Sequence, residues 1–201
     1  MPAPPLTPRL ARLVTDIRTA LRAPGGGAPA EAGRRVADAL AAHLGRPGLL
    51  TAAQCAADPL DYRQHLLHAE PDGTFSVVAL VWLPGQRTCV HDHVAWCVTG
   101  TYRGVEEERR YRLADDGTGR CLVPAGRSTN GPGTVAFVAP PGDIHEVRNA
   151  ADGTAVSLHV YGADLSRTGT SIRRRYDLPV RPPGDTSAEP SAPVRDGVRR
   201  P

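Results

Sequence analysis

The chain has 201 residues, of which 40% are hydrophobic and 22% are charged, and its formal net charge at pH 7 is +3. This length and composition suit one soluble globular domain, and no apolar run approaches the roughly 20 residues that span a bilayer, which argues against a membrane protein. The small charge, with Arg residues mixed among acids, argues against a nucleic-acid partner, and the lack of a signal-peptide pattern predicts a cytoplasmic protein.

Two amphipathic helices are predicted near the start of the chain. Apolar residues recur at helical spacing over Leu10–Leu21, Thr7 is placed to cap this helix, and Pro8 suits its first turn. A second helix is predicted over Pro29–Leu44, and a short third one is expected to start at Thr51. We expect these helices to pack on the outside of the following domain.

From Tyr62 onward, short apolar runs rich in Val, Leu and Thr alternate with turns that contain Gly, Pro or Asp. This pattern is typical of an all-β barrel or sandwich. The mixed Glu and Arg run over 105–110 is interpreted as a solvated face. The predicted strands are Arg63–His68, Phe75–Leu83, Thr88–His91, Ala95–Arg103, Arg109–Arg112, Val135–Val138, His145–Asn149 and Ala155–Tyr161.

The elements divide the chain into three predicted parts. Residues 1–60 form a helical extension, residues 61–177 form a barrel, and residues 178–201 form a tail. The tail contains six Pro from Pro179 onward and little apolar content, so it cannot bury enough surface to offset its ordering entropy. We therefore expect a disordered Pro-rich tail.

Three histidines have the placement that a metal site requires. His91 and His93 are two residues apart, so on a strand both side chains project from one face. His145 follows the turn 140–143, which could aim its imidazole at the same point. Three neutral imidazoles are good ligands for a divalent metal and leave positions open for substrate. Spacing alone leaves equally open that these residues belong to a polar strand edge and a turn.

The glycines and prolines around these histidines distinguish the two interpretations. The first segment has Gly85, five residues, His91, one residue, His93, three residues, Cys97, six residues and Gly104; the second has Pro140, one residue, Gly142, two residues, His145, three residues and Asn149. These segments resemble the two signature motifs of the cupin superfamily, except that Cys97 replaces a Glu that is usually a fourth ligand. The resemblance implies an all-β cupin barrel, or double-stranded β-helix (jelly roll), with N-terminal helices outside and a metal on His91, His93 and His145.

The missing Glu and the strand that carries Ser157, His159 and Tyr161 resemble the thiol dioxygenases of the cysteine dioxygenase type I family. These three residues alternate, so all should face the barrel interior. The resemblance implies an Fe(II) cofactor and a catalytic relay that acts on a small thiol and O2 to give a sulfinic acid. The alternative is a strand of ordinary core residues with one buried histidine.

The segment after Tyr62 bears on the substrate. Family members that act on cysteine carry an Arg two residues after a Tyr, whereas this chain has Gln64 there. In that respect it resembles bacterial 3-mercaptopropionate dioxygenases, in which an Arg after the Ser-His-Tyr strand meets the carboxylate. The resemblance implies 3-mercaptopropionate as substrate, bound by Tyr62, Gln64 and an Arg, with Arg173 favoured and Arg174 next.

Cys97 and the assignment of function leave alternatives open. In animal cysteine dioxygenases the corresponding Cys is joined to a Tyr, so the resemblance implies either a Cys97–Tyr161 crosslink or a free buried thiol. The four Cys lack CxxC spacing, so structural disulfides are not expected. A cysteine dioxygenase and a non-catalytic cupin that binds a metal or ligand are the alternative functions. The chain is expected to be a monomer or a small homo-oligomer.

Overall fold

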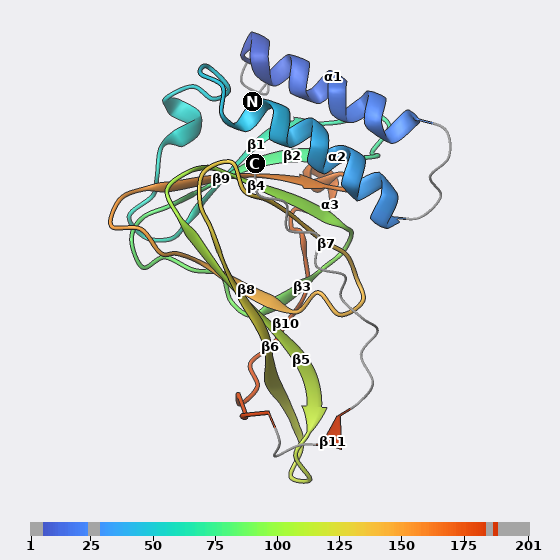
Figure 1. Cartoon of the computed structure of the whole chain (residues 1–201), viewed down its shortest axis with the longest axis vertical. Helices are drawn as coiled ribbons and strands as arrows, with labels where there is room; N and C mark the ends of the chain where they lie inside the picture. The colour runs from blue at the N-terminus through green and yellow to red at the C-terminus, as the bar shows by residue number, and fades with distance from the viewer. Residues whose placement is uncertain (1–5, 24–28, 184–186, 189–201) are drawn as a thin grey trace.

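A computed structural model of the chain describes residues 6–23, 29–183 and 187–188. Two long helices lie against one side of a β-barrel, and a two-stranded hairpin projects from the opposite side (Figure 1). The helices are α1 (Pro8–Arg22), α2 (Pro29–Leu44) and α3 (Leu165–Thr168), with a 3-10 turn at Ala53–Cys55. The strands are β1 (Arg63–Ala69), β2 (Ser76–Trp82), β3 (His91–His93), β4 (Cys97–Arg103), β5 (Glu106–Asp115), β6 (Arg120–Asn130), β7 (Val135–Val138), β8 (His145–Asn149), β9 (Ala155–Tyr161), β10 (Ile172–Arg175) and β11 (Ser187–Ala188).

The strands among the described residues form two antiparallel sheets. The first has the order β1-β2-β9-β4-β7, and the second has the order β10-β3-β8-β5-β11, with β6 paired to β5. Each sheet joins strands from early and late parts of the chain; β9, for example, lies between β2 and β4. The two sheets face each other as in a double-stranded β-helix (Figure 1), so the predicted cupin barrel with helices outside is confirmed.

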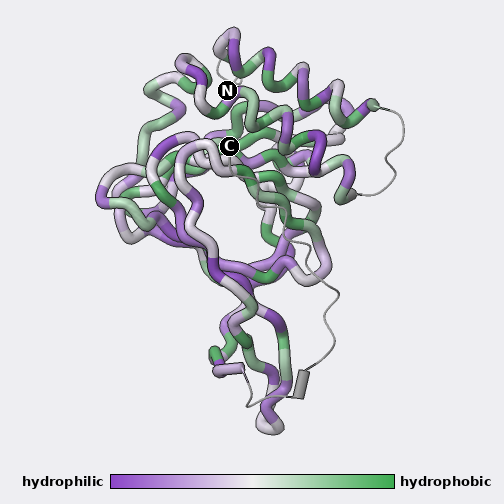
Figure 2. Tube along the Cα trace, in the orientation of Figure 1, coloured by the Kyte–Doolittle hydropathy of each residue, from purple (hydrophilic) through white to green (hydrophobic). Residues whose placement is uncertain are grey.

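The two predicted helices form over the expected residues. Thr7 caps α1 because its hydroxyl accepts a hydrogen bond of 3.0 Å from the backbone N–H of Leu10. Leu13 and Ile17 of α1 are buried with Leu40 of α2 against the outer face of the first sheet, and Figure 2 shows apolar and polar residues alternating along both helices. Each such buried side chain contributes about 1.5–3 kcal/mol, so packing rather than helix propensity holds this layer.

Strand β9 is buried on both faces, and this positions the side chains of the predicted relay. One face lies under the helices, where Val156, Leu158 and Val160 join the main apolar core. The residues between them therefore point into the barrel. The inward residues of β9 are Ser157, His159 and Tyr161, and all three are buried.

The helix expected from Thr51 is a single 3-10 turn. The strands differ from the prediction at the hairpin and after Tyr161, where β10 and β11 were not predicted. Strand β6 (Arg120–Asn130) was not predicted, and β5 starts earlier than expected, at Glu106. Both strands extend beyond the barrel, so polar residues occur on either face and leave no apolar alternation to detect. Pro124 also argues against a strand, but here a register irregularity next to Tyr111 accommodates it. Strand β3 begins at His91, three residues later than predicted.

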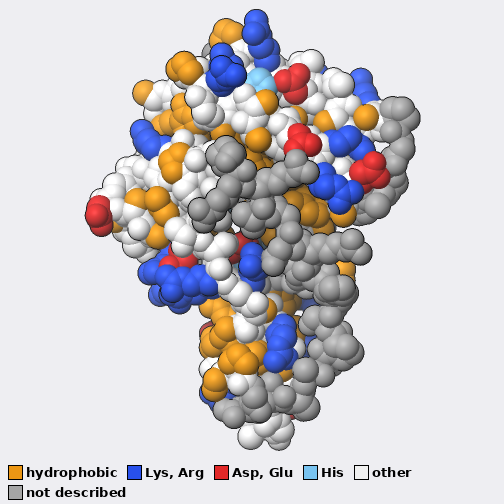
Figure 3. All heavy atoms as spheres, viewed as in Figure 1, with side chains coloured by type: hydrophobic (Ala, Val, Ile, Leu, Met, Phe, Trp, Pro, Cys, Tyr) orange, Lys and Arg blue, Asp and Glu red, His pale blue; other side chains and the backbone are white. Residues whose placement is uncertain are grey.

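The prediction of a solvated face over 105–110 is wrong for its three glutamates. Glu106, Glu107 and Glu108 are only 3%, 2% and 5% exposed. Glu107 faces outward, where Arg109, Arg127 and Arg148 surround it. The other two project to the opposite face of the strand, because neighbouring residues alternate. Away from this cluster, Figure 3 shows Arg and acidic side chains intermingled on the face it displays.

Backbone pairing continues past residue 177, where the sequence suggested that the barrel ends. The N–H of Leu122 donates to the carbonyl of Pro179, and the N–H of Arg181 donates back to Leu122, both at 2.9 Å. Strand β11 (Ser187–Ala188) pairs with β5. The remainder of the predicted tail, 184–186 and 189–201, lies outside the described residues. Among the described helices, none is long and apolar enough to cross a membrane.

Candidate metal centre

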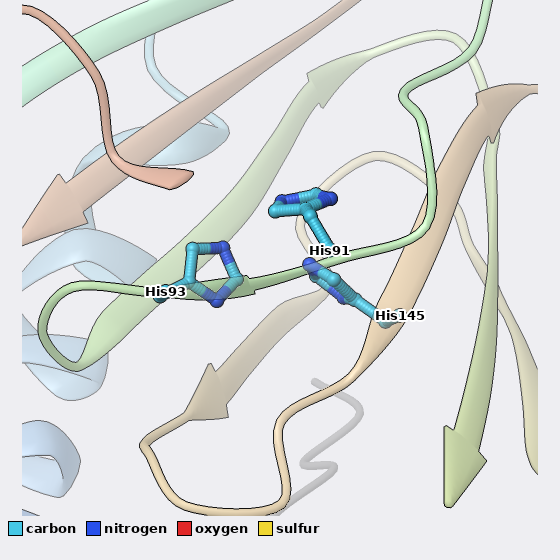
Figure 4. A group of neighbouring side chains, drawn as sticks. All are labelled: His91, His93 and His145. Carbon is cyan, nitrogen blue, oxygen red and sulfur yellow. The ribbon is translucent and has the colours of Figure 1, made fainter. Parts of the chain in front are cut away.

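Three histidines from two neighbouring strands converge on one point inside the barrel (Figure 4). His91 and His93 come from β3, and His145 lies directly opposite His91 on β8. Their ring centroids form a nearly equilateral triangle with sides of 4.8 to 4.9 Å. One potential ligand atom from each residue lies within 4.8 Å of the other two, and all three side chains are buried. The structure therefore brings together the three residues expected to hold a metal.

Each of these imidazoles has its Nδ1 atom held by a hydrogen-bond acceptor. His91 Nδ1 is 3.0 Å from the carbonyl of Cys89, His93 Nδ1 is 2.9 Å from Asp143 Oδ2, and His145 Nδ1 is 2.7 Å from Glu108 Oε1. Because these acceptors offer only oxygen lone pairs, Nδ1 carries the hydrogen and Nε2 keeps its lone pair. Orientation of metal-binding histidines by carboxylates and carbonyls is a general feature of metal sites.

The protonation states also suit a metal. Burial lowers the pKa of His91 to about 3, and the nearby His145 and His93 act in the same direction. Burial likewise lowers the pKa of His93. These rings are therefore neutral near pH 7, as metal ligands must be. The Nε2 atom of His145 is buried without any hydrogen-bond partner, which a bound divalent metal would supply. The donor set thus fits a metal ion that prefers imidazole nitrogen.

Asp143 and Glu108 each hold one of these histidines, and neither was predicted as a site residue. Asp143 ends the turn that was expected only to aim His145; its Oδ2 also accepts from the backbone N–H of His93 at 3.1 Å. Burial alone would raise the pKa of both carboxyl groups, but the hydrogen bonds with His145 and His93 oppose it, and each pKa is lowered. A visible signal was the position of Asp143 directly after Gly142, whose φ of +96° favours glycine.

A second chain of hydrogen bonds runs along β9 beside the three histidines. Ser157 Oγ is 2.9 Å from His159 Nε2, and the Tyr161 hydroxyl is 3.2 Å from His159 Nδ1. The Tyr161 ring lies 6.0 Å from that of His93, between centroids. Burial lowers the pKa of His159 to about 3 and raises that of Tyr161, so both are neutral near pH 7. The expected Ser-His-Tyr series is therefore contiguous and adjoins the triangle.

Cys97 lies beside this relay. It is opposite Tyr161 in the pairing of β4 with β9, and its Sγ is 3.8 Å from His159 Nδ1. Burial raises the pKa of the Cys97 thiol, and the Tyr161 hydroxyl is close enough to hydrogen bond with it. All four cysteines are free, as expected.

Gly104 ends the motif that contains His91, His93 and Cys97, and its backbone requires glycine. Its φ is +77°, and a Cβ there would lie 2.6 Å from the Cα of Ala155.

A small cavity opens onto the three histidines. Tyr62 stacks on Trp82 with ring centroids 4.6 Å apart, and Gln64 is within hydrogen-bonding reach of Tyr62. The lining residues are Tyr62, Gln64, Leu80, Trp82, Thr88, His91, His93, His145, Val147, His159, Tyr161, Ser171 and Ile172.

None of Arg173, Arg174 and Arg175 lines this cavity, and all three are exposed. Arg173 donates to Asp92 Oδ2 at 2.5 Å, and the Tyr176 hydroxyl donates to the same oxygen at 2.8 Å. The cause is a register irregularity in β10, which shifts the alternation of side chains after Ile172. As a result Arg175 lies opposite His91, and residues paired in this way project to the same side of a sheet. The charge of Arg175 acts on the pKa of Tyr62, which burial raises.

Comparisons with known proteins identify relatives of this chain. Residues 51–174 match the family described as cysteine dioxygenase type I. Among solved structures, TT1209 from Thermus thermophilus is 23% identical, with a TM-score of 0.41 over 57% of this chain and 95% of that one. A Cupin 2 conserved barrel domain protein from Salinispora arenicola is also 23% identical, with a TM-score of 0.40 over 58% of this chain and 85% of that one.

Proposed function

Because the chain belongs to the cysteine dioxygenase type I family, we propose that it is an iron-dependent thiol dioxygenase that favours 3-mercaptopropionate. The observation that carries the proposal is the His91, His93 and His145 triangle, with each Nδ1 atom held and a Ser-His-Tyr relay beside it. The balanced reaction adds both atoms of O2 to the sulfur of one thiol and gives one sulfinic acid. No other oxidant or organic cofactor is required.

The three histidines would hold the metal through their Nε2 atoms. Bound there, iron(II) supplies the Lewis acidity that favours the thiolate form of the substrate and the redox chemistry of oxygen transfer. Asp143 and Glu108 keep the imidazoles in the required tautomer and orientation. The apolar side chains of Leu80 and Val147 in the cavity wall exclude water from the reacting sulfur.

Tyr161 is the residue best placed to act on the reacting groups. Its hydroxyl projects from β9 into the cavity beside His93, and it is held at its other side by His159. Because burial raises its pKa, the hydroxyl stays protonated and can donate a hydrogen bond to an oxygen that gains negative charge. Ser157 in turn holds His159, so the three residues act as one oriented group.

Arg175 is the Arg that we propose for the substrate carboxylate, in place of Arg173. It lies on the same side of the sheet as His91 and acts by its charge on Tyr62 in the cavity wall. Arg173 is instead occupied by Asp92. A guanidinium can hold a carboxylate with two parallel hydrogen bonds, which the Gln64 amide cannot match in charge. Gln64 and Tyr62 would then orient the carbon chain between carboxylate and thiol.

Oxygen uptake by iron-loaded protein tests the proposed function. The panel contains 3-mercaptopropionate, cysteine and cysteamine, which has no carboxylate, and the sulfinic acid is identified by mass spectrometry. We expect one O2 to be consumed per thiol, fastest with 3-mercaptopropionate. Faster turnover of cysteine would instead identify a cysteine dioxygenase. No uptake with any small thiol would refute the enzyme and favour a cupin that only binds a metal or ligand.

Matched variants test the role of Arg175. We expect Arg175→Ala to raise KM for 3-mercaptopropionate about tenfold or more with a smaller effect on kcat, because the carboxylate loses a charged partner. Arg173→Ala is the control, since Arg173 pairs with Asp92 outside the cavity lining. If Arg173→Ala raises KM and Arg175→Ala does not, our assignment is wrong and the residue favoured from the sequence is correct.

Cys97 and Tyr161 offer the parts of a thioether but are equally consistent with a free thiol. In a crosslink, a bond forms between Sγ and the tyrosine ring, the S–H and one ring C–H bond break, and O2 takes up the two hydrogens and two electrons as hydrogen peroxide. Intact mass after turnover decides the question: a crosslinked chain is about two hydrogen atoms lighter and resists reduction. An unshifted mass means that Cys97 stays a free buried thiol.

A further inference from the structure

Glu106 is a buried carboxyl group at the end of the Ser-His-Tyr relay, and the proposed reaction gives it no role so far. It lies on β5, on the same face as Glu108, and it is 3% exposed. Its carboxyl is close enough to Ser157 and Trp82 for both to act on it as hydrogen-bond donors. Its Oε1 atom is buried without a partner. A buried carboxyl oxygen without a hydrogen-bond partner lowers the stability of the folded protein, so its presence suggests a role.

No basic side chain compensates Glu106 among the described groups that act on it. Glu108 on its own strand is an acid, Trp82 of β2 and Ser157 of β9 are neutral, and the nearest titratable group of β9, His159, lies beyond Ser157. Opposite it in the sheet are two uncharged residues, Asn130 of β6 and Asn149 of β8. Burial therefore raises the pKa of Glu106 to about 7. Both protonation states are accessible near neutral pH.

We propose that Glu106 is a positioning residue whose protonation state sets the direction of every hydrogen bond along Ser157, His159 and Tyr161. The inference rests on the proposed function only where it assigns Tyr161 to the reacting groups. The continuous path is Glu106 to Ser157, Ser157 Oγ to His159 Nε2 at 2.9 Å, and His159 Nδ1 to the Tyr161 hydroxyl at 3.2 Å. Because His159 is neutral, only one of its two ring nitrogens carries a hydrogen. If Nε2 changes from donor to acceptor, Nδ1 must change from acceptor to donor, so a reversal at Ser157 reaches Tyr161.

With Glu106 ionised, the carboxylate can only accept, so the Ser157 hydroxyl donates to it. Ser157 Oγ then accepts from His159 Nε2–H, which leaves His159 Nδ1 as an acceptor for the Tyr161 hydroxyl. The Tyr161 hydrogen is thereby directed away from the cavity. Trp82 Nε1–H lies 3.4 Å from Ser157 Oγ and within reach of the Glu106 carboxyl. Because it can only donate, in either state, it does not set the direction of the path.

With Glu106 protonated, the direction of the path reverses. The carboxylic acid donates to Ser157 Oγ, Ser157 donates to His159 Nε2, and His159 Nδ1–H donates to the tyrosine oxygen. The Tyr161 hydrogen is then free to point into the cavity. Protonated Glu106 therefore makes Tyr161 a donor toward the substrate, and ionised Glu106 makes it an acceptor.

The tautomer of His159 is a direct readout that needs no turnover. Long-range 15N–1H NMR of the zinc-loaded protein distinguishes Nδ1–H from Nε2–H, and the His159→Asn variant assigns the signals. We expect Nδ1–H well below pH 7 and Nε2–H well above it in the wild-type protein. One unchanged tautomer across this range would overturn the proposal, and this arm requires no Glu106 variant to fold.

Glu106→Gln supplies the second arm. A glutamine amide does not titrate, so we expect a single His159 tautomer at every pH and no inflection in kcat near pH 7. Wild-type kcat should fall about tenfold per pH unit above that inflection, because Tyr161 ceases to donate. Glu106→Asp keeps a titrating carboxyl and should restore an inflection. Glu107→Gln, on the outer face of the same strand, should keep the wild-type profile.

The outcomes separate this proposal from the proposed function. A wild-type protein that oxidises no thiol refutes the dioxygenase, while the NMR arm still decides the role of Glu106. A wild-type protein that turns over, with an inflection that persists unchanged in Glu106→Gln, refutes the role of Glu106 alone. A KM effect in Glu106→Gln without any change in the pH profile of kcat would also overturn it, because that result indicates only a structural contact.

Discussion

Around the three histidines, the buried carboxyl groups of Asp143 and Glu108 each face an imidazole, whereas Glu106 at the end of the relay faces only a neutral hydroxyl and an indole. Burial acts to raise the pKa in all three cases, but only the first two face an imidazole that opposes it, and only their pKa values are lowered. The same residue type is thus held as an anion in one region and titrates near pH 7 in the other. The comparison teaches that the partner, more than the depth of burial, decides the charge of a carboxyl group.

Loss of a histidine should have the largest effect on the metal region. We expect His91→Ala to abolish iron retention and oxygen uptake, because two imidazoles remain where three are needed to hold the ion. Metal content after purification is the measurement, with His65→Ala, whose Nε2 bonds the carbonyl of Ala56, as the matched control. Full activity of iron-free His91→Ala would contradict the whole scheme.

Removal of the Tyr161 hydroxyl should have the second-largest effect, and this effect should be confined to the relay. We expect Tyr161→Phe to lower kcat about 100-fold or more, the usual contribution of one positioned proton donor, and to leave the iron content unchanged. Steady-state oxygen uptake and metal analysis on the same sample measure the two effects separately. An unchanged kcat would remove Tyr161 from the reacting groups.

Replacing a carboxylate next to a histidine should weaken the metal without abolishing it. For Glu108→Gln we expect a loss of about 10–100-fold in metal affinity, because His145 loses a charged acceptor for its Nδ1–H. Competition with a chelator measures the affinity. Glu107→Gln on the opposite face of β5 is the control, and equal effects of the two substitutions would show that Glu108 acts only through the strand.

The outer face of β5 should affect stability in a pH-dependent way. A hydrogen bond from Arg148, together with those from Arg109 and Arg127, lowers the pKa of Glu107 from 4.5 to about 2. Because the folded pKa is depressed, this stabilisation is present above pH 4.5 and is lost as the pH falls toward 2. Thermal unfolding of wild type and Glu107→Gln should therefore differ in Tm near neutral pH and converge in acid. A difference in Tm that does not change with pH would argue that the ion pairs of Glu107 do not provide this stabilisation.

Glu106 should change stability with the opposite sign. Its folded pKa is raised from 4.5 to about 7, so folding favours the protonated form and the wild-type protein loses stability as the pH rises through this window. Relative to wild type, Glu106→Gln should gain in Tm over the same range. Parallel Tm curves for the two proteins would mean that the Glu106 carboxyl does not titrate there.

Much of the fold and of the metal site could be predicted because the signals are local. Helical spacing and Thr7 defined the first helix, and the two-residue spacing of His91 and His93 placed both on one strand face. The alternation of Ser157, His159 and Tyr161 likewise predicted their common direction. The hairpin strand β6 and the true boundaries of β5 were missed because polar residues on both faces leave no periodic pattern.

The histidines that could hold a metal and the strand that carries the relay were both predictable from the sequence, because each depends on residue spacing and motif residues within short segments. Only the tertiary structure decided the rest. The run 105–110 has the composition of a solvated segment, yet three separate environments bury its glutamates beside His145, Ser157 and a group of arginines. One irregular register in β10 directed Arg173 to Asp92 and Arg175 toward His91. Such outcomes depend on pairing between distant segments, which no local pattern encodes.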